Sequence, residues 1–244
     1  MSTPHLLIGA LALAALAGLW LLTAPQGHPA VSARSIAQAA PCDPLPARFA
    51  FVGPDPGQPV VPRGPSARWD GKYINPGAVL VHDGTFHMLR NGFKNWPGDI
   101  SVGHASSPDG RVWTGLEADP VLRSGQVPFA APGVDVSSAL VEDDGTWTLY
   151  FHTVNFGQSW EVGRASGPGP RGPWTVHPEP VLRAGAPGEW DERHVMWPSV
   201  TRTEAGYAML YGGQNLDGEV RIVLATSPDG VSWTKHGAPV LGPI

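Results

Sequence analysis

The sequence predicts an all-β protein whose strands form four-stranded antiparallel blades, the architecture of a β-propeller. The first observation is a repeat: residues 105–122 (ASSPDGRVWTGLEADPVL) recur at 225–241 (ATSPDGVSWTKHGAPVL) and, more loosely, at 165–182 (ASGPGPRGPWTVHPEPVL). The second is its period, because Trp113, Trp174 and Trp233 lie 61 and 59 residues apart. The third is composition, since 31 Gly and 27 Pro with only 15% charged residues favour short strands and turns over helices.

The repeated stretch is expected to form a hairpin. In its Ser-Pro-Asp-Gly sequence, proline presets φ at the second turn position, aspartate can hydrogen-bond nearby backbone, and glycine accepts a positive φ. Alternating apolar residues flank the turn on both sides, as they do in paired strands. The tryptophan then begins the outgoing strand and packs on a neighbouring sheet, while the closing Pro-Val-Leu suits an edge strand.

Three units follow one plan, and we expect one blade from each, at 69–123, 133–183 and 190–244. Each unit has an acidic approach, an apolar strand, a tight turn and an alternating second strand; the approaches read WDGKYINPGAVLV, GVDVSSALVE and WDERHVMWPSVTR. The turns Asp83-Gly84, Asp144-Gly145 and Ala205-Gly206 are hairpin signals. A third strand and the repeat hairpin complete each blade. Propellers usually close with about four to eight blades, so the ring is expected to be truncated or open, with residues 43–68 as a source of a partial blade.

The segment before the blades predicts export. Leu6 to Leu22 is an uncharged run of 17 residues, which indicates a signal peptide or an N-terminal membrane anchor at 1–24. The expected location is secreted, periplasmic or tethered at the membrane, with a cytoplasmic chain as the alternative. Residues 25–68 are rich in Pro, Ala and Gly and predict a linker, with one strand around Arg48 to Val52. Cys42 is the only cysteine, so no intrachain disulfide can form.

Charge and histidine spacing argue against two classes of ligand. The net charge is -5 and no basic run exceeds a dipeptide, so nucleic acid is not an expected partner. Nine histidines include no His-x-x-x-His pair, and no metal-binding residues are predicted.

The approaches, the Pro-Ser-Val strand of the last unit and the ATSPDG-x-x-W-T-K hairpin together resemble the five-bladed propeller glycosidases, that is, glycoside hydrolase families 43, 32, 68 and 130. The resemblance covers residues 69–244. It implies an oligo- or polysaccharide partner, no cofactor beyond a structural Ca²⁺ by analogy, and a site in the central funnel. Glycoside hydrolysis needs two carboxyl groups that flank the bond.

The resemblance places the catalytic carboxyl groups at the starts of the innermost strands. Asp135 matches the aspartate of the second blade and is the first catalytic candidate; the alternative is a turn aspartate that caps the strand. Glu192 and Asp70 are the further candidates, Glu192 because it breaks the repeat. Asp70 and Asp191 share a Trp-Asp context, and a repeated residue is more often structural than catalytic.

Two departures from family 43 affect the expected activity. Its Asp-Pro base is here Asn75-Pro76, and its Glu-Gly-Pro acid is here Met196-Trp197-Pro198. An amide cannot accept the catalytic proton and a thioether cannot donate one. Asn-Pro-Gly-Ala and Arg90 look more like family 130, which cleaves mannosides by phosphorolysis or hydrolysis; Asn75 and Arg90 would then bind sugar or phosphate, with Asp135 as proton donor. The rival expectations are a non-catalytic carbohydrate-binding or scaffold propeller and an inactive fragment.

Further residues are expected to bind substrate. Trp96 and Trp160 lie near strand ends in polar loops and could stack on sugar rings, with packing between blades as the alternative. His194 could orient Glu192 or a sugar hydroxyl. His152 and Asp191 complete the expected binding residues.

Overall fold

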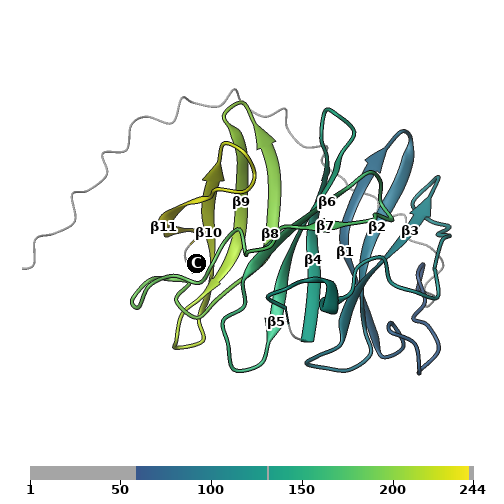
Figure 1. Cartoon of the computed structure of the whole chain (residues 1–244), viewed down its shortest axis with the longest axis horizontal. Helices are drawn as coiled ribbons and strands as arrows, with labels where there is room; N and C mark the ends of the chain where they lie inside the picture. The colour runs from purple at the N-terminus through teal and green to yellow at the C-terminus, as the bar shows by residue number, and fades with distance from the viewer. Residues whose placement is uncertain (1–58, 131, 242–244) are drawn as a thin grey trace, which may run out of the picture. The chain divides into compact units, whose positions relative to one another are not determined.

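The computed structural model describes residues 59–130 and 132–241. The expected N-terminal signal or anchor, Cys42 and the strand around Arg48 to Val52 lie outside these residues. The described chain is all β apart from one short 3₁₀ turn, η1 (Ser124–Gln126). The expected all-β fold of antiparallel blades is confirmed. Figure 1 shows the blades in a row, with β1–β3 in blue and β8–β11 in yellow-green on either side of the teal β4–β7.

The first blade contains β1 (Tyr73–His82), β2 (Thr85–Phe93) and β3 (Ile100–Ser107), paired antiparallel in chain order. Its outer edge is completed by bridges from Val102 to Leu122 and from Ser106 to Thr114. The second blade contains β4 (Pro132–Val141), β5 (Trp147–Asn155), β6 (Val162–Gly167) and β7 (Thr175–Val176). β3 also touches β4 in parallel at Ile100 and Gly133, which joins the first two blades into one sheet.

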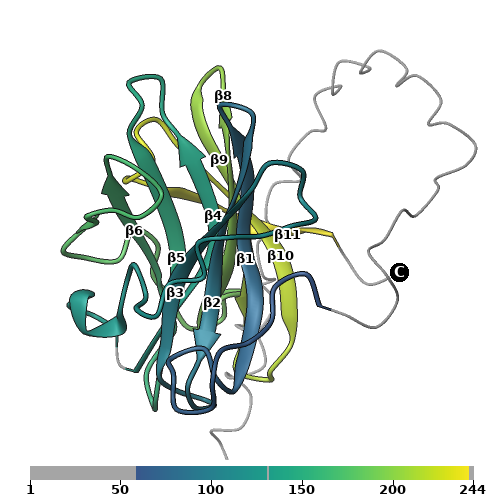
Figure 2. The ribbon, with the colours of Figure 1, turned by 90° about the vertical axis from the view of Figure 1, so that its right-hand side faces the viewer.

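The third blade contains β8 (His194–Thr203), β9 (Gly206–Gln214), β10 (Val220–Ser227) and β11 (Thr234–Leu241). Its sheet has the order β11-β10-β9-β8, so β8 is the counterpart of β1 and β4. In Figure 2 the view runs along the row of blades.

The core fills the gaps between blades. Every residue of β5 is buried, because its alternating side chains face different neighbours. Leu149 and Phe151 join a cluster with Leu89 of the first blade, whereas Tyr150 joins one with Met209 of the third. The Tyr150 hydroxyl also donates to the carbonyl of Gly230, 2.9 Å away. The blade faces thus pack on neighbouring blades, as expected.

The outer faces of the row are not covered in the same way. Val79 and Val81 of β1 are exposed at one end of the row, and Leu210 and Ile222 of the third blade are exposed at the other. The described blades therefore form an open arrangement. None of the described helical turns has the length and apolar character needed to cross a bilayer.

The Ser-Pro-Asp-Gly turns have the chemistry expected of the repeat. In the last copy, the Ser227 hydroxyl accepts the Gly230 N–H at 2.9 Å, and the Asp229 carboxylate accepts the N–H groups of Val231 and Ser232 at 2.8 and 2.7 Å. These backbone hydrogen bonds lower the pKa of Asp229 to about 2. The Trp233 indole N–H closes the turn on the Gly230 carbonyl. Trp113 does the same in the first copy, so the tryptophan also closes its own turn.

Asp229→Ala is expected to lower the melting temperature by roughly 2–4 °C, the effect of about 1 kcal/mol in a domain of this size. Because the folded pKa of Asp229 lies below its unfolded value, this contribution is complete at neutral pH and is lost as the pH falls toward 2. Thermal unfolding measured across pH checks it. Asp217→Ala, in an exposed loop, is the control, and equal melting temperatures for the two variants at pH 7 would rule out the proposed role.

Candidate functional site

The three innermost strands are irregular at the same place. The pairing register breaks between Asn75 and Ala78 in β1, between Val136 and Ser138 in β4, and between Met196 and Ser199 in β8. Bulges re-aim side chains and are frequent beside active sites. Together they form a cavity of about 330 Å³, here called the bulge cavity, lined by Asn75, Pro76, Gly77, Asp135, Val136, Ser137, Trp197, Pro198 and Ser199.

Asp135 is the carboxyl group of the bulge cavity. Its residue is 9% exposed, and burial raises its pKa to about 6 against an opposing hydrogen bond from Asn75. A carboxyl group in this state exchanges a proton near neutral pH, as a general acid or base must. Of the four carboxylates considered from the sequence, Asp135 is the one that lines this cavity.

A buried residue that the sequence analysis did not identify holds Asp135. The side-chain amide of Asn91, in β2, lies 2.8 Å from the Asp135 carboxylate, 2.7 Å from the Asn75 oxygen and 2.9 Å from the Val136 carbonyl. Its own oxygen accepts the Val136 N–H at 2.8 Å. Asn91 therefore fixes the bulge of β4 and the direction of its carboxylate. The sequence held no signal for this residue, because Asn91 pairs with Asn75 only after the register shift at the bulge of β1.

Asp70 lies in a buried ion-pair cluster. Arg68 and Arg90 both donate to its carboxylate, with Arg90 Nη1 at 2.7 Å. Burial disfavours ionisation, but the hydrogen bonds from Arg68 and Arg90 outweigh it and hold the pKa of Asp70 below its usual value. The Arg90 guanidinium also stacks over Trp69, with its carbon 4.8 Å from the ring centre. Neither Asp70 nor Arg90 lines the bulge cavity.

Asp191 occupies the equivalent place in the third blade. The Tyr211 hydroxyl donates to its carboxylate at 2.8 Å, and Lys235 Nζ lies 2.7 Å away. Tyr211 of β9 thus stands where Arg90 stands in β2. Both aspartates of the repeated Trp-Asp sequence are therefore buried and ion-paired, and each lies shortly before the first strand of its blade.

Glu192 lies in a turn outside the bulge cavity. Its carboxylate accepts the backbone N–H groups of Gly188 at 2.6 Å and Leu216 at 3.1 Å, which lower its pKa. It borders a second cavity of about 620 Å³ together with Trp160 and His194. The structure does not bring Glu192 into the cavity of Asp135.

The predicted histidines and Trp160 form an aromatic group. Trp160 stacks on His194 at 4.8 Å and on His152 at 5.6 Å between ring centres. The Trp160 backbone N–H also donates to His194 Nδ1. Desolvation lowers the pKa of the buried His152 to about 3, so its ring is neutral. His152 is buried and packs against the Trp160 ring, whereas His194 and Trp160 line the second cavity.

Trp96 lies on the other side of Asn75. Its exposed ring tilts against Phe93 at 5.8 Å and lines a shallow cavity of about 320 Å³ with Tyr73, Ile74 and Asn75. Because Asn75 lines this cavity and the bulge cavity alike, the two are adjacent. Trp96 therefore lines a cavity next to the bulge cavity.

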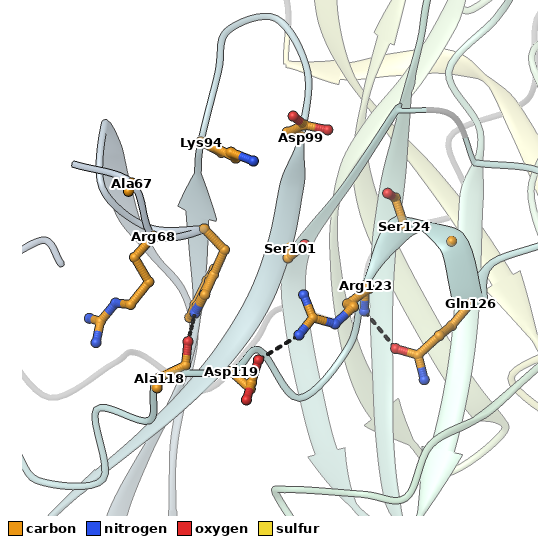
Figure 3. A pocket seen from close by; sticks show the side chains of 12 residues that line it. Ala67, Arg68, Lys94, Asp99, Ser101, Ala118, Asp119, Arg123, Ser124 and Gln126 are labelled. Atoms are coloured by element: carbon orange, nitrogen blue, oxygen red, sulfur yellow. Dashed lines mark hydrogen bonds and ion pairs between the residues drawn. The ribbon is translucent and has the colours of Figure 1, made fainter. Parts of the chain in front are cut away.

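The outer side of the first blade has a polar cavity of about 540 Å³ that shares no residue with the bulge cavity. Figure 3 shows its charged side chains, among them Lys94, Asp99 and Arg123. Arg123 pairs with Asp119 at 2.7 Å, and Arg68 pairs with Asp70. Both arginines of this cavity are therefore already paired with aspartates of the same chain. No cluster of His, Cys, Asp and Glu suited to a metal ion occurs in the described ranges.

Comparison with known proteins identifies the fold. No protein family and no curated protein matches the chain. A family 117 glycoside hydrolase from Zobellia galactanivorans is 20% identical, with a TM-score of 0.58 over 68% of this chain and 56% of its own. An endo-1,4-β-xylanase from Bacteroides thetaiotaomicron is 15% identical (TM-score 0.54, 72% and 58% covered). A fructan 1-exohydrolase from Cichorium intybus is 18% identical (TM-score 0.54, 68% and 32% covered).

These similarities are structural and partial. The chain spans less than two thirds of the length of each of these structures. At such identities the likeness shows the fold alone, a propeller-type arrangement of antiparallel blades that the chain shares with these structures. The resemblance found in the sequence is thereby confirmed for the fold alone.

Proposed function

We propose that this chain binds a glycan in the bulge cavity and that Asp135 is the general acid in cleavage of a glycosidic bond. The observation that carries this proposal is a buried carboxyl group, with a pKa of about 6, that lines a cavity formed by the bulges of three innermost strands. A glycosidase acid must be protonated at its working pH, which a raised pKa provides. The glycosidase fold supports the same reading.

The residues around Asp135 favour hydrolysis over phosphorolysis. Phosphate sites are usually built from cationic side chains and backbone N–H groups. No Lys or Arg is among the described residues that line the bulge cavity, and Arg90 is paired with Asp70. In this proposal water is the attacking group, and Asn75 orients a sugar hydroxyl.

A second candidate is carbohydrate binding without cleavage. The observation that favours it is the pair of residues at the equivalent bulges of β1 and β8, where Asn75 and Met196 provide no carboxyl group. Hydrolysis by two carboxyl groups needs a partner for Asp135 at about 5–9.5 Å. Asp135 is the only carboxyl group among the described residues that line the bulge cavity.

One experiment separates the two candidates. The chain is incubated with aryl glycosides and with oligosaccharides of xylose, arabinose, fructose, mannose and galactose, and released sugar and binding heat are measured on the same samples. Turnover of any substrate supports the proposed enzyme activity. The control variant Asp217→Asn, changed in an exposed loop, should turn over the same substrate equally well. Saturable binding without released sugar supports the binding protein. Neither binding nor turnover across the panel would contradict both.

A further inference from the structure

Trp197, in the bulge of β8, has a conformation that bulky residues avoid. Its φ is 52°, in the left-handed region where a Cβ atom is strained. The residue before a proline is further restricted, and Pro198 follows. Nevertheless 52% of Trp197 is exposed, so burial of the indole does not offset this strain. Strained residues that persist in this way concentrate at functional sites.

The surrounding structure is arranged to hold Trp197 in place. Its backbone N–H donates to Nδ1 of the buried, neutral His152 at 3.5 Å, and the two rings meet edge to face at 6.2 Å. His152 is the β5 counterpart of Asn91, which holds Val136 in the same way. In β9 the counterpart is Gly212, where an added Cβ would lie 3.1 Å from the indole. Gly212 thus leaves room for the ring.

Trp197 and Asp135 line the same cavity. The other polar side chains in its lining are Asn75, Ser137 and Ser199, and none of the described lining residues is cationic. An aromatic face with a few convergent polar groups is the usual composition of a site for a small neutral ligand. A carboxyl group without a cation beside it disfavours an acidic ligand.

We propose that Trp197 is the stacking platform of the bulge cavity and that its ligand is an uncharged pyranose residue. This inference rests on the proposed function and specifies its ligand. The apolar face of the pyranose ring lies on the indole, while its hydroxyl groups reach Asp135 and Asn75. Trp96, beyond Asn75, is placed to contact the next residue of a longer chain.

The test compares Trp197→Phe with Trp197→Leu. Both side chains keep a Cβ in the strained conformation, but phenylalanine alone offers a ring face. Titration calorimetry uses xylo-, manno- and galacto-oligosaccharides as neutral probes and oligogalacturonate as the acidic probe. We expect the wild-type protein to bind a neutral probe, Trp197→Phe to stay within about fivefold of it, and Trp197→Leu to bind at least about tenfold more weakly. Trp190→Leu, beside Arg221, is the control and should bind like the wild type.

A third variant separates stacking from folding. In Trp197→Gly the residue can adopt the positive φ without strain. The melting temperature of this variant should therefore equal or exceed that of the wild type, while its affinity falls as in Trp197→Leu. Unchanged affinity in Trp197→Leu, or tighter binding of oligogalacturonate than of any neutral probe, would overturn the inference and leave the proposed function standing. A wild-type protein that binds none of the probes would overturn both.

Discussion

Asp135→Asn is expected to lower turnover of a responsive glycoside by about 10²–10⁴-fold, the usual contribution of general acid-base catalysis. Asparagine keeps the shape of the side chain and can still accept the hydrogen bond from Asn91. Glycan affinity should therefore change only a few-fold. Steady-state kinetics and calorimetry on the same preparations measure both effects. A loss of kcat with retained binding is the signature of a group that acts in the transition state.

The pH dependence follows from the raised pKa of Asp135. If the protonated form is the catalyst, kcat/KM of the wild type should fall above about pH 6. The stability of the fold should also decrease as the pH rises. Between about pH 4 and pH 6 the folded protein holds this proton and the unfolded protein has lost it, so the free energy of unfolding falls through this range. The difference between the ordinary and the raised pKa corresponds to a loss of about 3 kcal/mol in the free energy of unfolding. Asp135→Asn should therefore be more stable than the wild type at pH 7 by up to this amount, with the difference vanishing near pH 4.

Asp217→Asn is the matched control, because it makes the same chemical change in an exposed loop. The acid role of Asp135 would be refuted by an Asp135→Asn protein that keeps wild-type kcat. A uniform rise in KM at unchanged kcat would instead assign Asp135 to binding, in agreement with the second candidate function.

The fold was predictable because its signals are local. The hairpin at Ser107 and its copy at Ser227 use side-chain hydrogen bonds within five residues, and these reappear as the same sequence. The strands alternate at their own period, so the packing of β5 on both neighbouring blades follows once the units are aligned. The parallel contact of β3 with β4 has no such signal, because it depends on how neighbouring blades meet.

The site was predictable only in part, because its contacts join different blades. Asp135 could be chosen from its place in the second unit, and a repeated Trp-Asp indicated a structural alternative for Asp70 and Asp191. The sequence contains no sign that Asn91 reaches Val136 across 45 positions. Nor does it show that Trp197 has a positive φ, since a left-handed tryptophan contradicts local preference and exists only through tertiary contacts.

Asp70→Asn is expected to cost about 3–5 kcal/mol and to lower the melting temperature by roughly 6–20 °C. The cost is large because Arg90, the buried partner of Asp70, would remain in place. Arg90 is 1% exposed, its Nη1 pairs with Asp70, and its Nε and Nη2 have no hydrogen-bond partner among the described residues. An amide would leave this guanidinium buried and uncompensated. Calorimetric or fluorescence-detected unfolding at pH 7 measures the loss.

The pH dependence checks the cause of that loss. The folded pKa of Asp70 lies below its unfolded value, so its contribution is present above the ordinary carboxyl range and is lost as the pH falls through the folded pKa. The melting temperatures of the wild type and Asp70→Asn should therefore converge in acid. Asp70→Leu combined with Arg90→Met removes both buried charges and should recover most of the stability at pH 7, as apolar replacement of a buried ion pair often does.

Asp191→Asn offers a comparison within the same protein, because Asp191 has the equivalent place in the third blade. Its cationic partner, Lys235, has a side chain that is 23% exposed, and Tyr211 is neutral. When the carboxylate is removed, the ammonium group can turn to water at little cost, so the loss should be well under half of that in Asp70→Asn. Equal losses in the two variants would show that burial of the cation does not set the cost. Loss of activity at unchanged stability in Asp70→Asn would return this residue to the catalytic candidates.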